Sequence, residues 1–150
     1  NARCQPPLTA AICLIDLSDN PFPNISKHQG SFTVKYNVPV DPDLGDISIQ
    51  GTLYAQSRRY FTDAAARNIE QYGEQVRDAL SQGAFERINV RADWKNIRGS
   101  RVSGAVFINN LTDANYALTS IPQLHSLGTA VRIYGEPRTY GVMLRYAFGQ

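Results

Sequence analysis

Apolar and polar residues alternate along several long segments of this chain, which is the pattern of β-strands with only one face in an apolar environment. Most of these segments exceed the usual strand length of about five to six residues. They approach the about 9–11 residues that a tilted strand needs to cross a bilayer. The segment 102–110 gives the weakest signal, because it is apolar on both faces. We predict strands at residues 31–40, from 47 to about 60, at 85–95, at 102–110 and, at the end of the chain, at 140–148.

The segment 85–95 indicates what surrounds the two faces of such a strand. One face is apolar from Ile88 to Trp94, and the other is charged. In a transmembrane barrel the apolar face contacts lipid and the charged face lines the aqueous lumen. An Arg or Lys on the lipid face costs about 2–4 kcal/mol at mid-membrane, so the register is strongly fixed. A half-exposed sheet of a soluble protein would show the same alternation. The charged residues are Arg87, Arg91, Asp93 and Lys95.

The connections between the predicted strands alternate in length. Short turns at 41–46 and 96–100 follow the first and third strands, whereas long segments at 61–84 and 111–137 follow the second and fourth. This alternation is typical of outer-membrane barrels, whose periplasmic turns are short and whose external loops are long. It predicts that the C-terminus lies on the periplasmic side and that the residues before the first strand lie outside.

The first long connection also carries a helical pattern. Thr62 or Asp63 provides an N-cap and Gly83 provides a stop, so we expect a short amphipathic helix between them. Such a helix would lie on the rim of the barrel as a packed surface helix. Its apolar residues are Ala65, Ile69, Tyr72, Val76 and Leu80.

Composition narrows the classes of function. The chain is 43% hydrophobic and 19% charged, and its mean hydropathy is -0.31. No apolar run approaches the about 18 residues of a transmembrane helix. A transmembrane β-barrel remains compatible with this mean hydropathy, because apolar and polar residues alternate along its strands. A net charge of +2 is too small to indicate nucleic-acid binding. The sequence contains no nucleophile-elbow, phosphate-loop or zinc-protease motif, so we expect no enzyme and no cofactor.

Five strands do not close a barrel, because known closed barrels begin at about eight strands. Further strands at 7–17, 116–121 and 127–134 would make a complete small barrel of eight strands with a structural or passive role. Alternatively, the chain is the C-terminal portion of a longer barrel. A soluble β-barrel or sandwich that acts as a binding module is a third alternative.

Three motifs bear on this choice. The segment 109–116, Asn-Asn-Leu-Thr-Asp-Ala-Asn-Tyr, follows a predicted strand, and Gly-Glu-Pro-Arg-Thr-Tyr at 135–140 leads into the last one. The segment 16–24, followed by Lys-His-Gln at 27–29, precedes the first predicted strand as an external loop would. In this order and spacing the motifs resemble the C-terminal part of a TonB-dependent outer-membrane receptor. The resemblance covers nearly the whole chain.

This resemblance implies an all-β, antiparallel transmembrane barrel of about 22 strands with a plugged lumen. Residues 31–148 would supply its last five strands and residues 1–30 an external loop, while the plug domain is absent from residues 1–150. The intact receptor would lie in the outer membrane of a Gram-negative bacterium. It would import a scarce nutrient, such as a siderophore–iron complex, a cobalamin or an oligosaccharide, with energy from the TonB system. TonB would be contacted only through the absent N-terminal part.

The same resemblance gives the last strand a role in assembly. The alternating face of this strand would be the signal that the barrel-insertion machinery recognises. After insertion the same face would contact outer-membrane lipid. Many family members end on the aromatic residue, whereas Gly149 and Gln150 follow it here. The residues of the signal are Tyr140, Val142, Leu144, Tyr146 and Phe148.

Few residues suggest further chemistry. Cys4 and Cys13 enclose a short loop, which suits a disulfide in an oxidising compartment, although two buried free thiols also fit. We expect no metal site, because the sequence has 2 His and neither lies near the cysteines. Arg58 and Arg59, near an external strand end, are weak candidates for contacts with an anionic ligand, with ordinary rim charge as the alternative. His125, in an external loop, is another weak candidate for a ligand contact.

Overall fold

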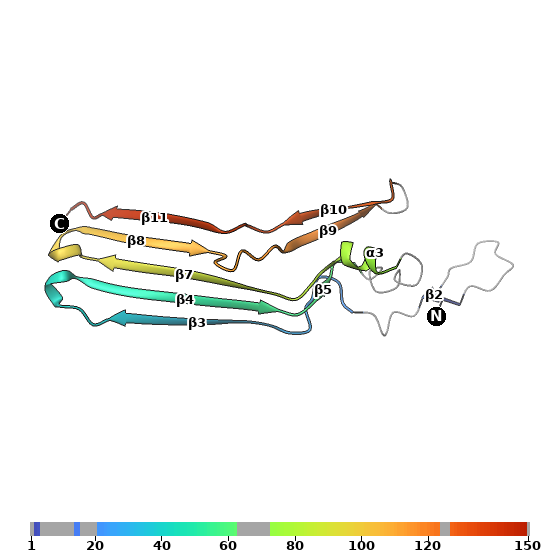
Figure 1. The fold of residues 1–150 in the computed structure, drawn as a ribbon, viewed down its shortest axis with the longest axis horizontal. Helices are drawn as coiled ribbons and strands as arrows, with labels where there is room; N and C mark the ends of the chain where they lie inside the picture. Colours follow the sequence, from blue (N-terminus) through green and yellow to red (C-terminus); the bar gives the residue numbers. More distant parts are fainter. Residues whose placement is uncertain (1, 4–13, 16–20, 63–72, 124–126, 150) are drawn as a thin grey trace.

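A five-stranded antiparallel sheet dominates the computed structural model, which describes residues 2–3, 14–15, 21–62, 73–123 and 127–149. Its strands follow one another as neighbours in the order β11-β8-β7-β4-β3, so β3 and β11 form the two edges (Figure 1). The strands are β3 Gln29–Val38, β4 Asp46–Gln56, β7 Phe85–Lys95, β8 Val102–Asn109 and β11 Thr139–Tyr146.

The five predicted strands are all confirmed, and β7 has the predicted bounds. The prediction for the second strand was too long, since β4 ends at Gln56. It ends there because both neighbours also end: Gln56 lies opposite Gln29 in β3 and opposite Phe85 in β7. Beyond this point a separate two-residue strand, β5 Arg59–Tyr60, pairs instead with β6 Ser81–Gln82.

Short turns close the strands at one end of the sheet, which we call the turn end. The turn between β3 and β4 contains the 3₁₀ segment η1 Pro42–Leu44, where the Asp41 carboxylate accepts a 3.0 Å hydrogen bond from the Asp43 amide. Gly45 follows with φ 91°, and a Cβ atom there would collide with the backbone oxygens of Lys95 and Asn96, where β7 ends and the next turn begins. That next turn, between β7 and β8, contains η2 Ile97–Gly99.

The opposite end carries the long connections and is called the loop end here. They contain α3 Glu74–Ala79 and a hairpin of β9 Ala117–Gln123 and β10 Thr129–Tyr134 (Figure 1). The helix predicted from Thr62 or Asp63 is therefore observed over its last part, and residues 63–72 lie outside the described residues. Alternating short and long connections are confirmed.

The extra strands predicted at 116–121 and 127–134 exist as β9 and β10. They pair with each other, and their two-stranded sheet lies beyond the five-stranded sheet. Because the hairpin joins neither β3 nor β11, it does not close the described strands into a barrel of eight. Within 7–17, the described residues contribute only β2 Leu14–Ile15, which pairs with β1 Ala2–Arg3.

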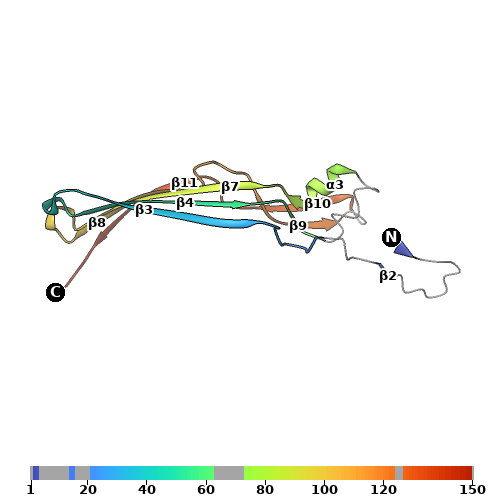
Figure 2. The same ribbon diagram turned by 90° about the horizontal axis from the view of Figure 1, so that it is seen from below.

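The sheet is a single layer, as the edge-on view shows (Figure 2). The buried apolar side chains of the described chain lie mainly at the loop end, where Leu80 and Ala117 are fully enclosed. On the sheet itself large apolar side chains are exposed, including Tyr140 at 82% and Leu144 at 77%. No second layer of described residues covers them.

The register places all apolar faces on the same side of this layer. Phe32 lies opposite Leu53, which lies opposite Ile88, and the same side continues through β8 to β11. From Ile47 to Ala55 the apolar side of β4 extends over about 26 Å at a rise of about 3.3 Å per residue. This length is of the same order as the apolar band of a transmembrane barrel, about 25 Å tall. The sheet therefore has one continuous apolar face. The opposite face, called the polar face here, is polar on β3, β4 and most of β7 and carries the apolar residues Ala105, Phe107 and Met143 on β8 and β11.

Candidate functional site

The middle of the polar face is lined by neutral side chains. Thr33, Thr52 and Asn89 lie opposite one another on β3, β4 and β7, and the two threonine hydroxyls are 3.0 Å apart. A pocket of about 360 Å³ lies over this band. Amide and hydroxyl groups of this kind can pair with either donors or acceptors, so the band forms a hydrophilic wall without a strong charge of its own. The pocket is also lined by the polar residues Gln50, Asn109 and Arg91 and by the apolar residues Phe107 and Met143.

Charged residues gather on the polar face at the turn end. The Arg91 guanidinium donates to the Asp93 carboxylate through Nε, at 3.0 and 2.9 Å, and through Nη2, at 2.8 Å. Lys95 and Arg145 line the same pocket, which has a volume of about 250 Å³. We call these four residues the basic end. The predicted location of Arg91, Asp93 and Lys95 on the polar face of their strand is confirmed.

Aromatic rings and an arginine gather on the polar face at the loop end. Phe85 stacks on Tyr116 with ring centroids 4.6 Å apart, and Tyr54 lies 6.0 Å from Phe85. Arg87 Nη1 donates a 2.8 Å hydrogen bond to the Tyr116 hydroxyl, and its guanidinium lies 5.6 Å from the centroid of that ring. We call Tyr54, Phe85, Arg87 and Tyr116 the mouth cluster. Its Arg87 Nε is enclosed without a hydrogen-bond partner among the described residues, as is Nε2 of the neighbouring Gln56.

Two sequence motifs meet in space beside the mouth cluster. The Asn110 side-chain amide donates to the carbonyl oxygen of Glu136 at 3.2 Å, and Arg138 Nη2 lies 3.5 Å from the Asp113 carboxylate. Gly135 receives the ring of Tyr116, which occupies the place that a Cβ atom would take. The segment Asn110–Tyr116 and the segment Gly135–Arg138 thus form one unit, which we call the clasp.

Asn110 holds the clasp together from its centre. It is 1% exposed and has a positive φ of 52°. Its side-chain amide also donates to the Ala114 carbonyl at 3.0 Å, and its side-chain oxygen accepts from the Ala114 amide at 2.9 Å. The clasp reaches β7 as well, because the Leu111 amide donates to the Ile88 carbonyl at 2.7 Å. It therefore ties β7, β8 and the start of β11 together.

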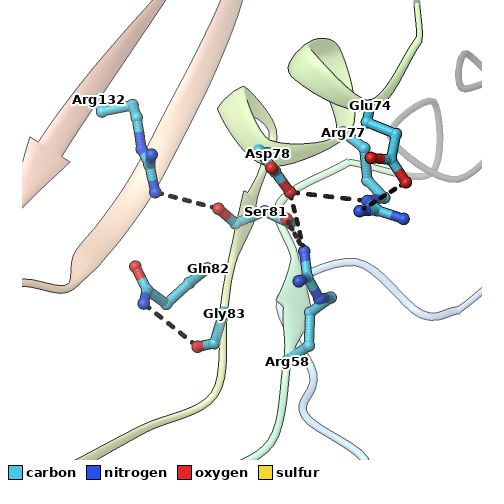
Figure 3. Close-up of polar contacts among 8 residues, drawn as sticks. All are labelled: Arg58, Glu74, Arg77, Asp78, Ser81, Gln82, Gly83 and Arg132. Carbon is cyan, nitrogen blue, oxygen red and sulfur yellow. Dashed lines mark hydrogen bonds and ion pairs between the residues drawn. The ribbon is translucent and has the colours of Figure 1, made fainter.

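The two candidate ligand arginines are bound to the protein itself (Figure 3). Arg58 Nη1 lies 3.2 Å from the Asp78 carboxylate of α3 and donates to the Ser81 hydroxyl at 3.1 Å. Arg59 Nη2 donates to the carbonyl oxygens of Ala117 and Leu118 at 3.3 and 3.1 Å. In this arrangement both side chains fasten the loops to one another. Arg58 remains 40% exposed, so part of its charge still faces solvent.

A third arginine of the loop end was not singled out from the sequence. Arg132 of β10 donates through Nη2 to the Ser81 carbonyl at 3.1 Å, so it attaches the outer hairpin to β6 (Figure 3). Gln82 completes this attachment, since its side-chain oxygen accepts from the Ala117 amide of β9 at 2.6 Å. The sequence signal was weak, because nothing local to Arg132 shows that β6 is its neighbour.

The remaining predicted residues fall into two groups. Cys4, Cys13 and His125 lie outside the described residues. The residues of the predicted assembly signal lie on or next to β11: Tyr140, Val142, Leu144 and Tyr146 are exposed on its apolar face, and the Phe148 ring contacts Tyr146 edge-on at 4.7 Å.

The described residues contain neither a candidate metal cluster nor a candidate membrane-spanning helix. No group of three or more His, Cys, Asp or Glu side chains there is arranged to hold a metal ion. In the same part of the chain, no helix has the length and apolarity required to cross a membrane.

Comparison with known proteins adds one finding. No protein-family model matches the chain, and no curated protein matches its sequence. Its structure is similar to that of the ferric yersiniabactin uptake receptor FyuA from Yersinia pestis, with a TM-score of 0.67 and 18% identity. The match covers 89% of this chain and 18% of that receptor, so the chain spans a small part of the receptor's length. The fold is therefore that of an antiparallel β-barrel segment, as the alternation predicts.

Proposed function

We propose that this chain forms the last strands of an outer-membrane active transporter that imports a scarce nutrient with energy from the TonB system. The intact protein then lies in the outer membrane of a Gram-negative bacterium. It is inserted by the barrel-insertion machinery, which reads the terminal strand, and it contacts TonB through an N-terminal part outside residues 1–150. The chain itself supplies one wall of the passage and its external loops, and we propose no enzymatic role for it.

One observation carries this proposal: a single-layer sheet with a continuous apolar face and an opposite face that is mainly polar. The apolar face is stable only against lipid or another apolar layer, and the polar face is stable only against water or polar protein. A barrel wall meets both requirements at once. The structural similarity to an iron-complex uptake receptor supports the same interpretation.

The order of the strands bears on the alternatives. In the described chain β3 and β11 are edges that do not pair with each other, and β9 and β10 lie outside the main sheet. This order gives no support to a complete eight-stranded barrel with a structural or passive role. The exposed apolar face does not support a soluble binding module either, because a soluble protein rarely exposes an apolar patch above a few hundred Å².

The mouth cluster indicates the kind of nutrient. Stacked rings provide flat contact area, and the half-buried Arg87 guanidinium beside them attracts an anionic group. A siderophore–iron complex with negatively charged ligand groups uses both features, whereas an uncharged oligosaccharide uses only the rings. Among a siderophore–iron complex, a cobalamin and an oligosaccharide, we therefore favour the first.

Arg87→Gln in the intact protein tests this proposal. We expect iron-complex uptake by iron-starved cells to require about tenfold more complex for half-maximal rate, because a hydrogen bond to a charged group contributes about 1.5–3 kcal/mol. Arg101→Gln, at the turn end, removes the same charge and should leave uptake unchanged. If deletion of the whole gene leaves growth on every tested iron complex, cobalamin and oligosaccharide unaffected, the transport proposal is wrong.

A further inference from the structure

The start of β9 is fastened to the other long connection by two side chains. The Ala117 amide donates to Gln82 Oε1 at 2.6 Å, and Arg59 Nη2 donates to the carbonyls of Ala117 and Leu118 at 3.3 and 3.1 Å. Gln82 and Ala117 are buried, so water does not compete for their contact. The backbone that follows Tyr116 is therefore held by residues of β5 and β6 as well as by its own hairpin partner, β10.

Tyr116 itself is enclosed between three neighbours. Its carbonyl accepts a 2.8 Å hydrogen bond from the Gly135 amide, and its ring stacks on Phe85. The ring also fills the space over Gly135 in which a Cβ atom would stand. Only 7% of Tyr116 is exposed, so its ring has little room to turn. A displacement of the adjacent Ala117 would therefore displace the Tyr116 hydroxyl as well.

That hydroxyl fixes the direction of the Arg87 guanidinium. Among the described residues it is the one hydrogen-bond acceptor of Arg87, at 2.8 Å from Nη1. A guanidinium is a rigid planar fork of N–H donors, so a bond at one nitrogen restricts where the others point. A group that is already oriented loses less side-chain freedom when it binds an anion. The orientation of Arg87 thus depends on where Tyr116 is held.

We propose that Arg59 is a positioning residue of the mouth cluster. By holding the backbone next to Tyr116, it keeps the Arg87 guanidinium in the orientation that receives an anionic group of the nutrient. This inference rests on the proposed function, which assigns such a group to Arg87. Arg59 itself does not contact the nutrient, because its Nη2 is engaged by the Ala117 and Leu118 carbonyls.

The reaction of Arg87 with phenylglyoxal, a reagent that condenses with guanidinium groups, tests this role without any nutrient. The intact protein is treated in detergent, and mass spectrometry of its peptides gives the rate at Arg87. Arg59→Met should raise this rate about tenfold, which corresponds to about 1.4 kcal/mol. Tyr116→Phe, which removes only the hydroxyl, should raise it equally.

Arg58→Met is the matched control. Arg58 also fastens the loop end, through the Asp78 carboxylate and the Ser81 hydroxyl, but its hydrogen bonds do not reach the backbone next to Tyr116. The rate at Arg87 should therefore stay at its wild-type value. Heat-dependent gel mobility checks that each variant still forms a folded barrel.

A double substitution separates positioning from a general loosening of the loops. Adding Arg59→Met to Tyr116→Phe should cause no further increase, because the hydroxyl through which Arg59 acts is already gone. The inference is overturned if Arg59→Met leaves the rate at Arg87 unchanged, if Arg58→Met raises it equally, or if the two single effects multiply in the double variant. These rates involve no transport, so a failure of the transport proposal in the gene-deletion experiment is seen separately.

Discussion

Val90→Arg should lower the free energy of unfolding of the membrane-inserted protein by about 2–4 kcal/mol, the cost of an arginine on the lipid face near mid-membrane. Val90 lies on the apolar face of β7, opposite Gly51 in β4 and Ile108 in β8. The new guanidinium would have neither water nor a counter-charge on that side of the sheet. Urea titration of the intact protein in lipid vesicles measures the change.

Arg91→Leu is the matched control, one residue away on the same strand. It breaks the ion pair with Asp93, but Arg91 is 41% exposed on the polar face. A solvent-screened pair of this kind contributes little to stability, so the expected loss is much smaller than for Val90→Arg. Equal losses for the two variants would mean that the two faces of β7 do not meet different environments.

Asn110→Ala should be the most damaging change at the loop end, with a loss of about 3 kcal/mol or more. The substitution removes three side-chain hydrogen bonds, to the carbonyls of Ala114 and Glu136 and from the Ala114 amide, and each such bond contributes about 0.5–1.5 kcal/mol. It also puts alanine at a φ of 52°, which alanine adopts poorly. Thermal unfolding of the intact protein in detergent would measure the loss.

Asn110→Gly separates the two contributions. Glycine accepts the positive φ without strain but also lacks the amide group. If the side-chain hydrogen bonds hold the clasp, the glycine variant should recover no more than about 1–2 kcal/mol of the alanine loss. A glycine variant as stable as the wild type would show that Asn110 serves only the backbone turn and that the clasp has no energetic role.

The strands and their faces could be predicted because one physical constraint acts along the whole length of each. A strand between lipid and water must change polarity at every residue, and β7 shows this from Ile88 to Trp94. The ends of the strands were less predictable. Where β4 stops depends on where β3 and β7 stop, and that information lies in other parts of the chain.

Pairing between distant segments could not be predicted from periodicity. The alternation in β9 and β10 indicates strands but does not show that they pair with each other outside the main sheet. The clasp is a similar case. Both of its motifs were recognised in the sequence, yet the contact from Asn110 to Glu136 crosses 26 positions and arises only when β8 and β11 pair.

The candidate ligand arginines show that tertiary contacts decide whether a charged side chain is available to a ligand. Arg58 and Arg59 lie just beyond the end of β4 at the loop end of the sheet, and basic residues at such a position were reasonable candidates for an anionic ligand. In the folded chain the Arg58 guanidinium donates to the Asp78 carboxylate, and the Arg59 guanidinium donates to the Ala117 carbonyl. Arg87, which was placed on the polar face but not proposed as a contact, supplies the guanidinium of the mouth cluster.

Fluorescence quenching at two neighbouring positions of β11 tests most directly whether the apolar face meets lipid. Cys4 and Cys13 are replaced by serine in the intact protein, and a single labelled cysteine is placed at Val142 or at Met143. We predict that a quencher attached to lipid chains dims the label at Val142 and leaves the label at Met143 unaffected. Equal responses at the two positions, or a Val142 label that no lipid quencher reaches, would contradict the assignment of this sheet to a membrane wall.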